Sequence, residues 1–224
     1  MGSGRSGIPK GIKDISNKTT GKQIKKTFRD ILNERPATVT HALNRDYLDP
    51  ANPHRDDWLN GNTPFKWYRE NCQRVCYAVD LQLSGFDVEA LPNKSDADGA
   101  GRMFGPNSYR NVYDGAKWDD FSASTTTEYL NHIKSLIPNS GDKCIIGCFW
   151  DSGGGHLFNA VNIRGKVYGV DGQITASNGG HLFDINDYVK SFRVGSNMDV
   201  LVTSDMSYKA TQLLKKFVKR RRKN

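Results

Sequence analysis

The spacing of apolar residues changes once along this 224-residue chain, near Pro138. Before that proline they recur every three or four residues, which predicts amphipathic helices, and after it they mostly alternate, which predicts strands. The helical segments are 21–34, 72–84, 124–137 and a short one near 185–191. The alternating segments are 143–150, 155–164, 166–172 and 198–203. Helices followed by a run of antiparallel strands predict an α+β fold.

Helix-capping residues and stretches of helix-breaking residues locate the boundaries of the remaining segments. Asn71 is the expected N-cap and Gly85 the expected C′ residue of the helix over 72–84. The two segments 36–68 and 93–120 are rich in Asn, Asp, Gly and Pro, so they read as irregular chain. A final basic helix is expected over about 206–219.

The net charge of +8 suggests a nucleic-acid binder only until it is divided along the chain. Residues 1–35 carry nine Lys/Arg against three Asp/Glu, and residues 209–224 carry eight against none. The remaining middle is acidic, with 15 against 21. Any contact with an anionic partner is therefore expected in the two basic terminal segments, where its affinity would depend strongly on salt concentration.

The expected organisation is a flexible segment over 1–20, a catalytic domain over 21–208 and a basic tail over 209–224. The Gly- and Ser-rich start resembles a linker or tag remnant and lacks the apolar core of a secretory signal. No apolar run approaches the roughly 20 residues that a membrane-spanning helix needs. The domain is thus expected to act without a membrane span, in the cytoplasm of a target or host cell after delivery, or as part of a larger secreted or virion protein.

Four cysteines occur as two pairs four residues apart, Cys72/Cys76 and Cys144/Cys148. A zinc site would favour tighter spacing, and a disulfide would favour a secreted chain, so neither is expected. Buried structural thiols are one remaining interpretation. The other is a reactive Cys72, because the first turn of a helix favours the thiolate.

A reactive thiol needs a proton acceptor, and His156 is the histidine best placed to supply one. It follows three glycines and opens a strand, whereas the other four histidines read as surface or packing residues. With a two-residue turn at 164–165, partners across the hairpin have numbers that sum to 329. Asp171 then lies diagonally opposite His156 and within reach of its ring, while Gln173 lies directly opposite.

Two blocks carry a family resemblance: Asn71-Cys72-Gln73-Arg74-Val75-Cys76 with its continuation to Pro92, and 155–161 with 168–173. They are similar, in the same order, to blocks of papain-fold toxins and of phage head-protein C-terminal domains. The resemblance implies a papain-like fold and a protein-glutamine deamidase. It implies that Cys72 is the nucleophile, His156 the base and Asp171 the orienting carboxylate, with Asn71 and Gln173 as weaker candidates for shaping the substrate and oxyanion site.

One departure from the family pattern keeps a second nucleophile open. The family segment has two residues between its cysteines, and this chain has three. Papain-type proteases follow the nucleophile with Trp-Ala, and Tyr77-Ala78 follows Cys76 here. Position at the helix start favours Cys72, and this sequence match favours Cys76.

Alternative functions also remain open at this point. A cysteine peptidase or isopeptidase would use the same acyl-enzyme chemistry with an amine as leaving group. A phage structural or interaction domain would keep the fold with little activity. The expected partners are a protein substrate in a target cell, an immunity or carrier protein, and an anionic partner of the tail. Papain-like chemistry requires neither a cofactor nor a metal.

Overall fold

The computed structural model describes residues 25–34, 43–55, 67–68, 70–94, 108–113, 115–149, 154–173, 181–190, 197–206 and 213–221. Its helices are α2 (Phe28–Glu34), α4 (Asp49–Ala51), α5 (Cys72–Leu83), α7 (Thr126–Leu136) and α8 (Ile185–Val189). Its strands are β1 (Val88–Ala90), β2 (Trp118–Ser122), β3 (Lys143–Phe149), β4 (Gly155–Ile163), β5 (Lys166–Val170), β6 (Leu182–Asp184), β7 (Asn197–Val202) and β8 (Val218–Arg220). Shorter turns are a π-helical turn at Asn44–Leu48 and 3₁₀ turns at Tyr109–Asn111 and Leu214–Lys216.

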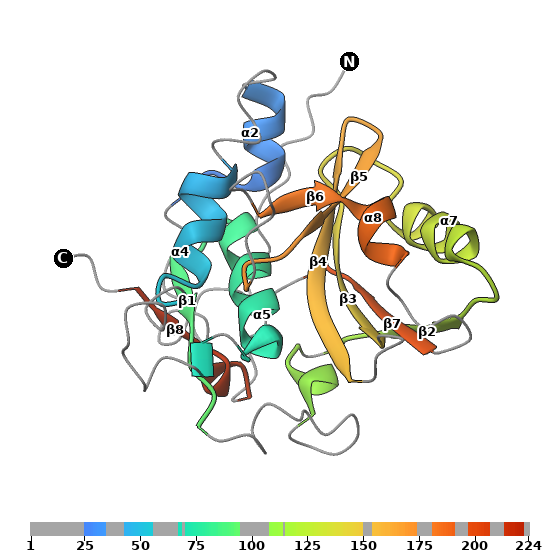
Figure 1. The fold of residues 1–224 in the computed structure, drawn as a ribbon. Coiled ribbons are helices and arrows are strands. Elements are labelled where there is room, and N and C mark those ends of the chain that lie inside the picture. Colours follow the sequence, from blue (N-terminus) through green and yellow to red (C-terminus); the bar gives the residue numbers. More distant parts are fainter. Residues whose placement is uncertain are drawn as a thin grey trace.

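The main sheet has six strands in the order β2-β7-β3-β4-β5-β6, with every pairing antiparallel. Helix α5 covers one face, and α7 and α8 lie over the other (Figure 1). The small β1–β8 sheet lies on the far side of α5 from the main sheet. The α+β class predicted from the sequence is thus confirmed.

Helix α5 lies between the two sheets, which explains why it is buried on all sides. Its residues 74–83 are all buried, so it has no solvent-facing stripe. It ends in a Schellman motif: the Gly85 amide donates to the Gln82 carbonyl (2.9 Å) and the Phe86 amide to the Leu81 carbonyl (3.0 Å). The φ of +88° at Gly85 is the left-handed conformation that glycine adopts without strain. The predicted C′ residue is therefore confirmed.

Alternation along β3 and β4 divides the core into two parts. Ile145, Leu157 and Val161 pack toward α5, whereas Ile146 and Phe158 belong to the cluster that includes residues of α7 and α8. The β4–β5 hairpin turns at Arg164 and Gly165, both with positive φ, and pairs Ile163 with Lys166. The predicted two-residue turn and its register are thus confirmed.

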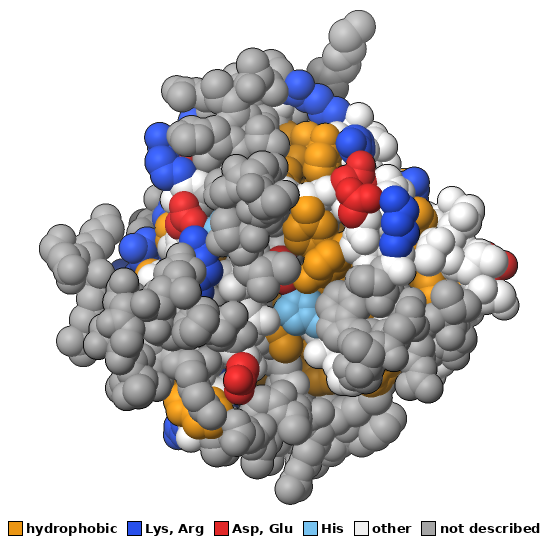
Figure 2. Space-filling view, in the orientation of Figure 1, with side chains coloured by type: hydrophobic (Ala, Val, Ile, Leu, Met, Phe, Trp, Pro, Cys, Tyr) orange, Lys and Arg blue, Asp and Glu red, His pale blue; other side chains and the backbone are white. Residues whose placement is uncertain are grey.

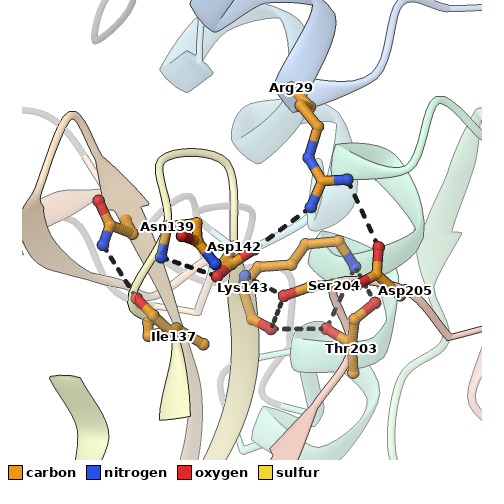
Figure 3. Close-up of polar contacts among 9 residues, drawn as sticks. Arg29, Ile137, Asn139, Asp142, Lys143, Thr203, Ser204 and Asp205 are labelled. Atoms are coloured by element: carbon orange, nitrogen blue, oxygen red, sulfur yellow. Dashed lines mark hydrogen bonds and ion pairs between the residues drawn. The ribbon is translucent and has the colours of Figure 1, made fainter. Parts of the chain in front are cut away.

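A buried polar network around Asp80 of α5 holds this helix against the main sheet. Asp80 of α5 is fully buried and pairs with the Lys143 ammonium from the start of β3. Thr203, which follows β7, donates its hydroxyl to Asp80 (2.6 Å), and Tyr113 donates to the other carboxylate oxygen (3.1 Å). Figure 3 shows Lys143 reaching Thr203 in this network. The ion pair therefore joins α5 to β3, and the hydrogen bonds of Thr203 add the segment after β7 to the same network.

Three element predictions are corrected. The segment 206–219 is not one basic helix, because its described part forms a 3₁₀ turn and strand β8, with Leu214 and Val218 buried. The expected loop over 93–120 contains the start of β2, and the expected irregular stretch over 36–68 contains α4 and the π-helical turn. Polar composition hid these elements because they are short.

The C-terminal strand neutralises part of its own charge within the fold. Lys219 pairs with Glu89 of β1 (2.7 Å), and Arg221 pairs with Asp87 (3.3 Å). Of the predicted helix over 21–34, residues 28–34 form α2, whereas the described residues 25–27 before it are not helical. The predicted segment 1–20 lies outside the described residues. No helix among the described residues is both long and apolar enough to span a bilayer.

Candidate active site

Cys72 is the first residue of α5 and is partly exposed. The backbone carbonyl of Asn71 accepts from the amides of Arg74 (2.8 Å) and Val75 (3.0 Å), which begins the helix. The Asn71 side chain makes no capping hydrogen bond and instead donates to the Leu91 carbonyl (3.1 Å). The first N–H groups of a helix carry partial positive charge, so this end suits a thiolate or an oxyanion.

His156 lies near the start of β4, with 8 % of its surface exposed. Its Nε2 donates to Asp171 Oδ2 (2.6 Å), and its side chain also interacts with Cys72. Since Nε2 is engaged with the carboxylate, Nδ1 is the ring nitrogen left for the thiol. The hairpin register placed Asp171 within reach of His156, and the two side chains are in contact.

Burial alone would lower the pKa of His156, because it penalises the charged ring. The charge of Asp171 and the hydrogen bonds to Asp171 and Cys72 outweigh burial and raise the pKa to about 10. Burial likewise opposes ionisation of Asp171, but the His156 charge and hydrogen bond, with the Gln173 amide, lower the Asp171 pKa. The imidazole is therefore cationic and the carboxylate ionised near neutral pH.

The other three thiols differ from Cys72 because all are buried. Cys76 is 1 % exposed, and its Sγ lies 3.3 Å from the Gln73 carbonyl within the helix. Burial, followed by the nearby Cys72 and Asp80, raises the pKa of Cys76 well above its ordinary value. Burial also raises the pKa of Cys144 and Cys148. Of the two candidate nucleophiles, Cys72 alone combines exposure with contact to the imidazole.

Asp171 is held by Gln173, a predicted candidate, and by Tyr188 and His181, which sequence reasoning did not assign to the site. The Tyr188 hydroxyl donates to Oδ2 (2.9 Å), and the Gln173 amide donates to Oδ1 (2.8 Å). His181 Nδ1 donates to the Asp171 carbonyl (3.0 Å), while the Asp171 amide donates to the His181 carbonyl (3.1 Å). A helix over 185–191 was expected, but no spacing signal in it marks Tyr188. His181 was expected as a surface or packing residue, and it is a buried one beside the site.

Two polar groups beside the catalytic candidates lack partners among the described residues. The buried Nε2 of Gln173 is a donor without an acceptor, and the buried Oδ1 of Asn71 is an acceptor without a donor. Strand β5 ends at Val170, so Gln173 is not paired with His156 as the hairpin rule suggested. Both atoms are buried, and residues 174–180 next to Gln173 lie outside the described part of the chain.

Gly172 sets the approach between α5 and the segment that carries Asp171. A Cβ at this position would lie 2.8 Å from Val75 Cγ1 and 2.9 Å from Val79 Cγ2. We expect Gly172→Ala to lower the free energy of unfolding by about 1–3 kcal/mol through overpacking, measured by urea denaturation. Adding Val75→Ala should restore part of the loss, and a Gly172→Ala protein as stable as wild type would contradict this steric account.

The surface around the site is partly apolar. Figure 2 shows a histidine ring near the centre of this face with hydrophobic side chains above and below it. Phe149, at the end of β3, is 38 % exposed, and its ring approaches Gly155 beside His156. No group of three or more His, Cys, Asp or Glu in the described part of the chain is arranged to hold a metal ion.

Comparison with known proteins gives one result. Residues 70–176 match the model of a family described as papain fold toxin 1, glutamine deamidase. No curated protein and no solved structure matched the chain. The matched segment runs from the residue before Asn71 to just beyond Gln173, so it contains helix α5 and strands β1 to β5. The resemblance to papain-fold toxins and the papain-like fold are confirmed, and the phage part of the resemblance stays a prediction.

Proposed function

Starting from this toxin-type glutamine deamidase match, we propose that the chain deamidates a glutamine side chain of a partner protein, with Cys72 as nucleophile, His156 as proton donor and acceptor, and Asp171 as orienting carboxylate. One observation carries the assignment of roles. A partly exposed thiol at a helix start interacts with an imidazole whose Nε2 is hydrogen-bonded to a buried carboxylate at 2.6 Å.

The first half of the reaction is acylation. The Cys72 thiolate attacks the carboxamide carbon, and the C–N bond then breaks as His156 gives its proton to the departing ammonia. The product is a thioester between Cys72 and the substrate side chain. The donors proposed for the oxyanion are the backbone N–H groups at the start of α5 and the Nε2 of Gln173, which has no acceptor among the described residues.

The second half is hydrolysis of that thioester. His156, now neutral, takes a proton from water, and the resulting hydroxide equivalent attacks the carbonyl carbon. The C–S bond breaks to release glutamate and the Cys72 thiolate, with His156 again protonated. Asp171 stays ionised throughout and stabilises the imidazolium that begins and ends the cycle.

The proposal is tested by the product. A protein extract is incubated with wild type and with His156→Ala, and peptides are compared by mass spectrometry. We expect intact chains in which selected glutamines have become glutamates, with ammonia released, only in the wild-type reaction. New chain ends without glutamate formation would instead identify a peptidase, and equal deamidation by His156→Ala would refute the mechanism.

The titration of His156 gives a pH prediction. Because its pKa is raised to about 10, the cation is kept from neutral pH up to about that value and lost above it. Deamidation, which needs the imidazolium proton, should decline as pH rises through about 10. Alkylation of Cys72 by iodoacetamide needs only the thiolate and should not decline there, as peptide mapping of the labelled cysteine would show.

The wider setting is proposed on the same basis. We propose that the substrate protein lies in the cytoplasm of a cell to which this domain is delivered, and that an immunity or carrier protein accompanies it. An anionic partner is proposed for the basic tail over 209–224. A deamidated side chain gains a negative charge, which would alter the target without cutting it.

A further inference from the structure

The carboxylate of Asp171 receives donors at both oxygens. Oδ2 accepts from His156 Nε2 (2.6 Å) and from the Tyr188 hydroxyl (2.9 Å), and Oδ1 accepts from the Gln173 amide (2.8 Å). Tyr188 therefore shares one oxygen with the imidazole. The Asp171 oxygen that accepts from His156 is therefore also held by a hydrogen bond from helix α8.

The ring of Tyr188 is fixed in place by aromatic neighbours. Its centroid lies 4.2 Å from that of Phe183 and 4.8 Å from that of Phe158, the latter edge to face. The His156 ring lies edge-on at 6.3 Å. Such packing restricts rotation of the Tyr188 side chain, so its hydroxyl cannot leave Oδ2 without disturbing β4 and β6.

The direction of the Tyr188 hydrogen bond follows from charge. Burial, followed by the charge of Asp171, raises the pKa of Tyr188, so the phenol stays neutral and donates. Donation to a carboxylate stabilises the ionised form, which is one of the causes that lower the pKa of Asp171. Among the described residues, the titratable groups near Asp171 are His156 from β4, Tyr188 from α8, Cys76 from α5, Cys148 from β3 and His181 ahead of β6.

We propose that Tyr188 is a positioning residue of the active site, which acts through Asp171 to keep the carboxylate ionised and aimed at His156 Nε2. This inference rests on the proposed function, because it assigns Tyr188 a part in the Cys72–His156–Asp171 arrangement. Tyr188 lies outside the matched segment 70–176. The site is therefore completed by chain that the family match does not cover.

The test is the pH profile of Cys72 alkylation by iodoacetamide in wild type and Tyr188→Phe. Removing the hydroxyl raises the pKa of Asp171, so on acidification the carboxylate becomes protonated at a higher pH. The acid limb of the profile, which is the pH range where the alkylation rate falls on acidification, should therefore move up by about one pH unit, the size expected for a hydrogen bond to a charged group. Tyr168→Phe, which removes a hydroxyl from β5 away from Asp171, is the matched control and should leave the limb in place.

A second comparison uses Asp171→Asn, which removes the charge through which Tyr188 acts. In that background, adding Tyr188→Phe should not shift the limb further, since the two changes are coupled. A Tyr188→Phe profile that overlays wild type, or one lowered at every pH with its limb unmoved, would overturn the proposal. If wild-type Cys72 showed no His156-dependent alkylation at low pH, the proposed function itself would fail, which is a distinguishable result.

Discussion

Cys72→Ala is expected to reduce glutamine deamidation by about a thousandfold or more, because the acyl-enzyme cannot form without the nucleophile. Fold stability should change little, since the thiol is partly exposed at the first turn of α5. The readouts are glutamate formation by peptide mass spectrometry and thermal unfolding of the purified variant. A loss of activity with unchanged unfolding would separate a chemical role from a structural one.

Cys76→Ala is the matched control, since it removes the same atom one helical turn further along. Cys76 is 1 % exposed and its thiol is held protonated by burial, so activity per folded molecule should survive. Packing should suffer slightly, since a small buried side chain is truncated. The opposite pattern, an active Cys72→Ala protein and an inactive but folded Cys76→Ala protein, would assign the nucleophile to Cys76.

Lys143→Met is expected to give the largest loss of stability, about 3–5 kcal/mol of unfolding free energy, because it removes the ammonium that pairs with the buried Asp80 carboxylate. The carboxylate is fully buried, and Thr203 and Tyr113, which also donate to it, are neutral hydroxyls. Urea denaturation at neutral pH measures the effect. Activity should fall in parallel, since the pair anchors the helix that begins with Cys72.

The double variant Asp80→Leu/Lys143→Met is the informative companion. Replacing both partners with apolar side chains removes the uncompensated charge, so much of the lost stability should return. Lys190→Met breaks an ion pair with Asp187 in which both side chains are more than two-thirds exposed, and it should change little. A Lys143→Met protein as stable as the Lys190→Met protein would show that the buried pair does not hold α5 in place.

Local sequence rules located much of the site because its parts are close along the chain. The start of α5 was predicted from Asn71 as N-cap residue and from apolar spacing, although the Asn71 side chain makes no capping hydrogen bond, and the contact of His156 with Asp171 was predicted from a two-residue turn. Both depend on neighbours within one helix or one hairpin. The pairing of Cys72 with His156 was expected from the place of His156 after three glycines at the start of a strand, and from the family resemblance, because no local rule joins a helix to a distant strand.

The remainder depended on tertiary contacts between weakly patterned segments. Strands β1 and β8 have three residues each and lie far apart in sequence, so neither shows a period that pattern reasoning can detect. Tyr188 and His181 are defined as site residues only by what they touch. The basic composition of the tail suggested a solvated helix, whereas Leu214 and Val218 commit it to the core.

The docking of the C-terminal segment has a consequence for synthesis of the protein. Arg74, two residues after Cys72, donates to the Lys216 carbonyl, and the Phe217 ring packs edge to face with Tyr77 of the same helix (5.4 Å). A nascent chain emerging from the ribosome presents Cys72 long before residues 213–221 exist. Helix α5 therefore lacks these contacts until that segment is translated, so partly made chains would not have the complete candidate site.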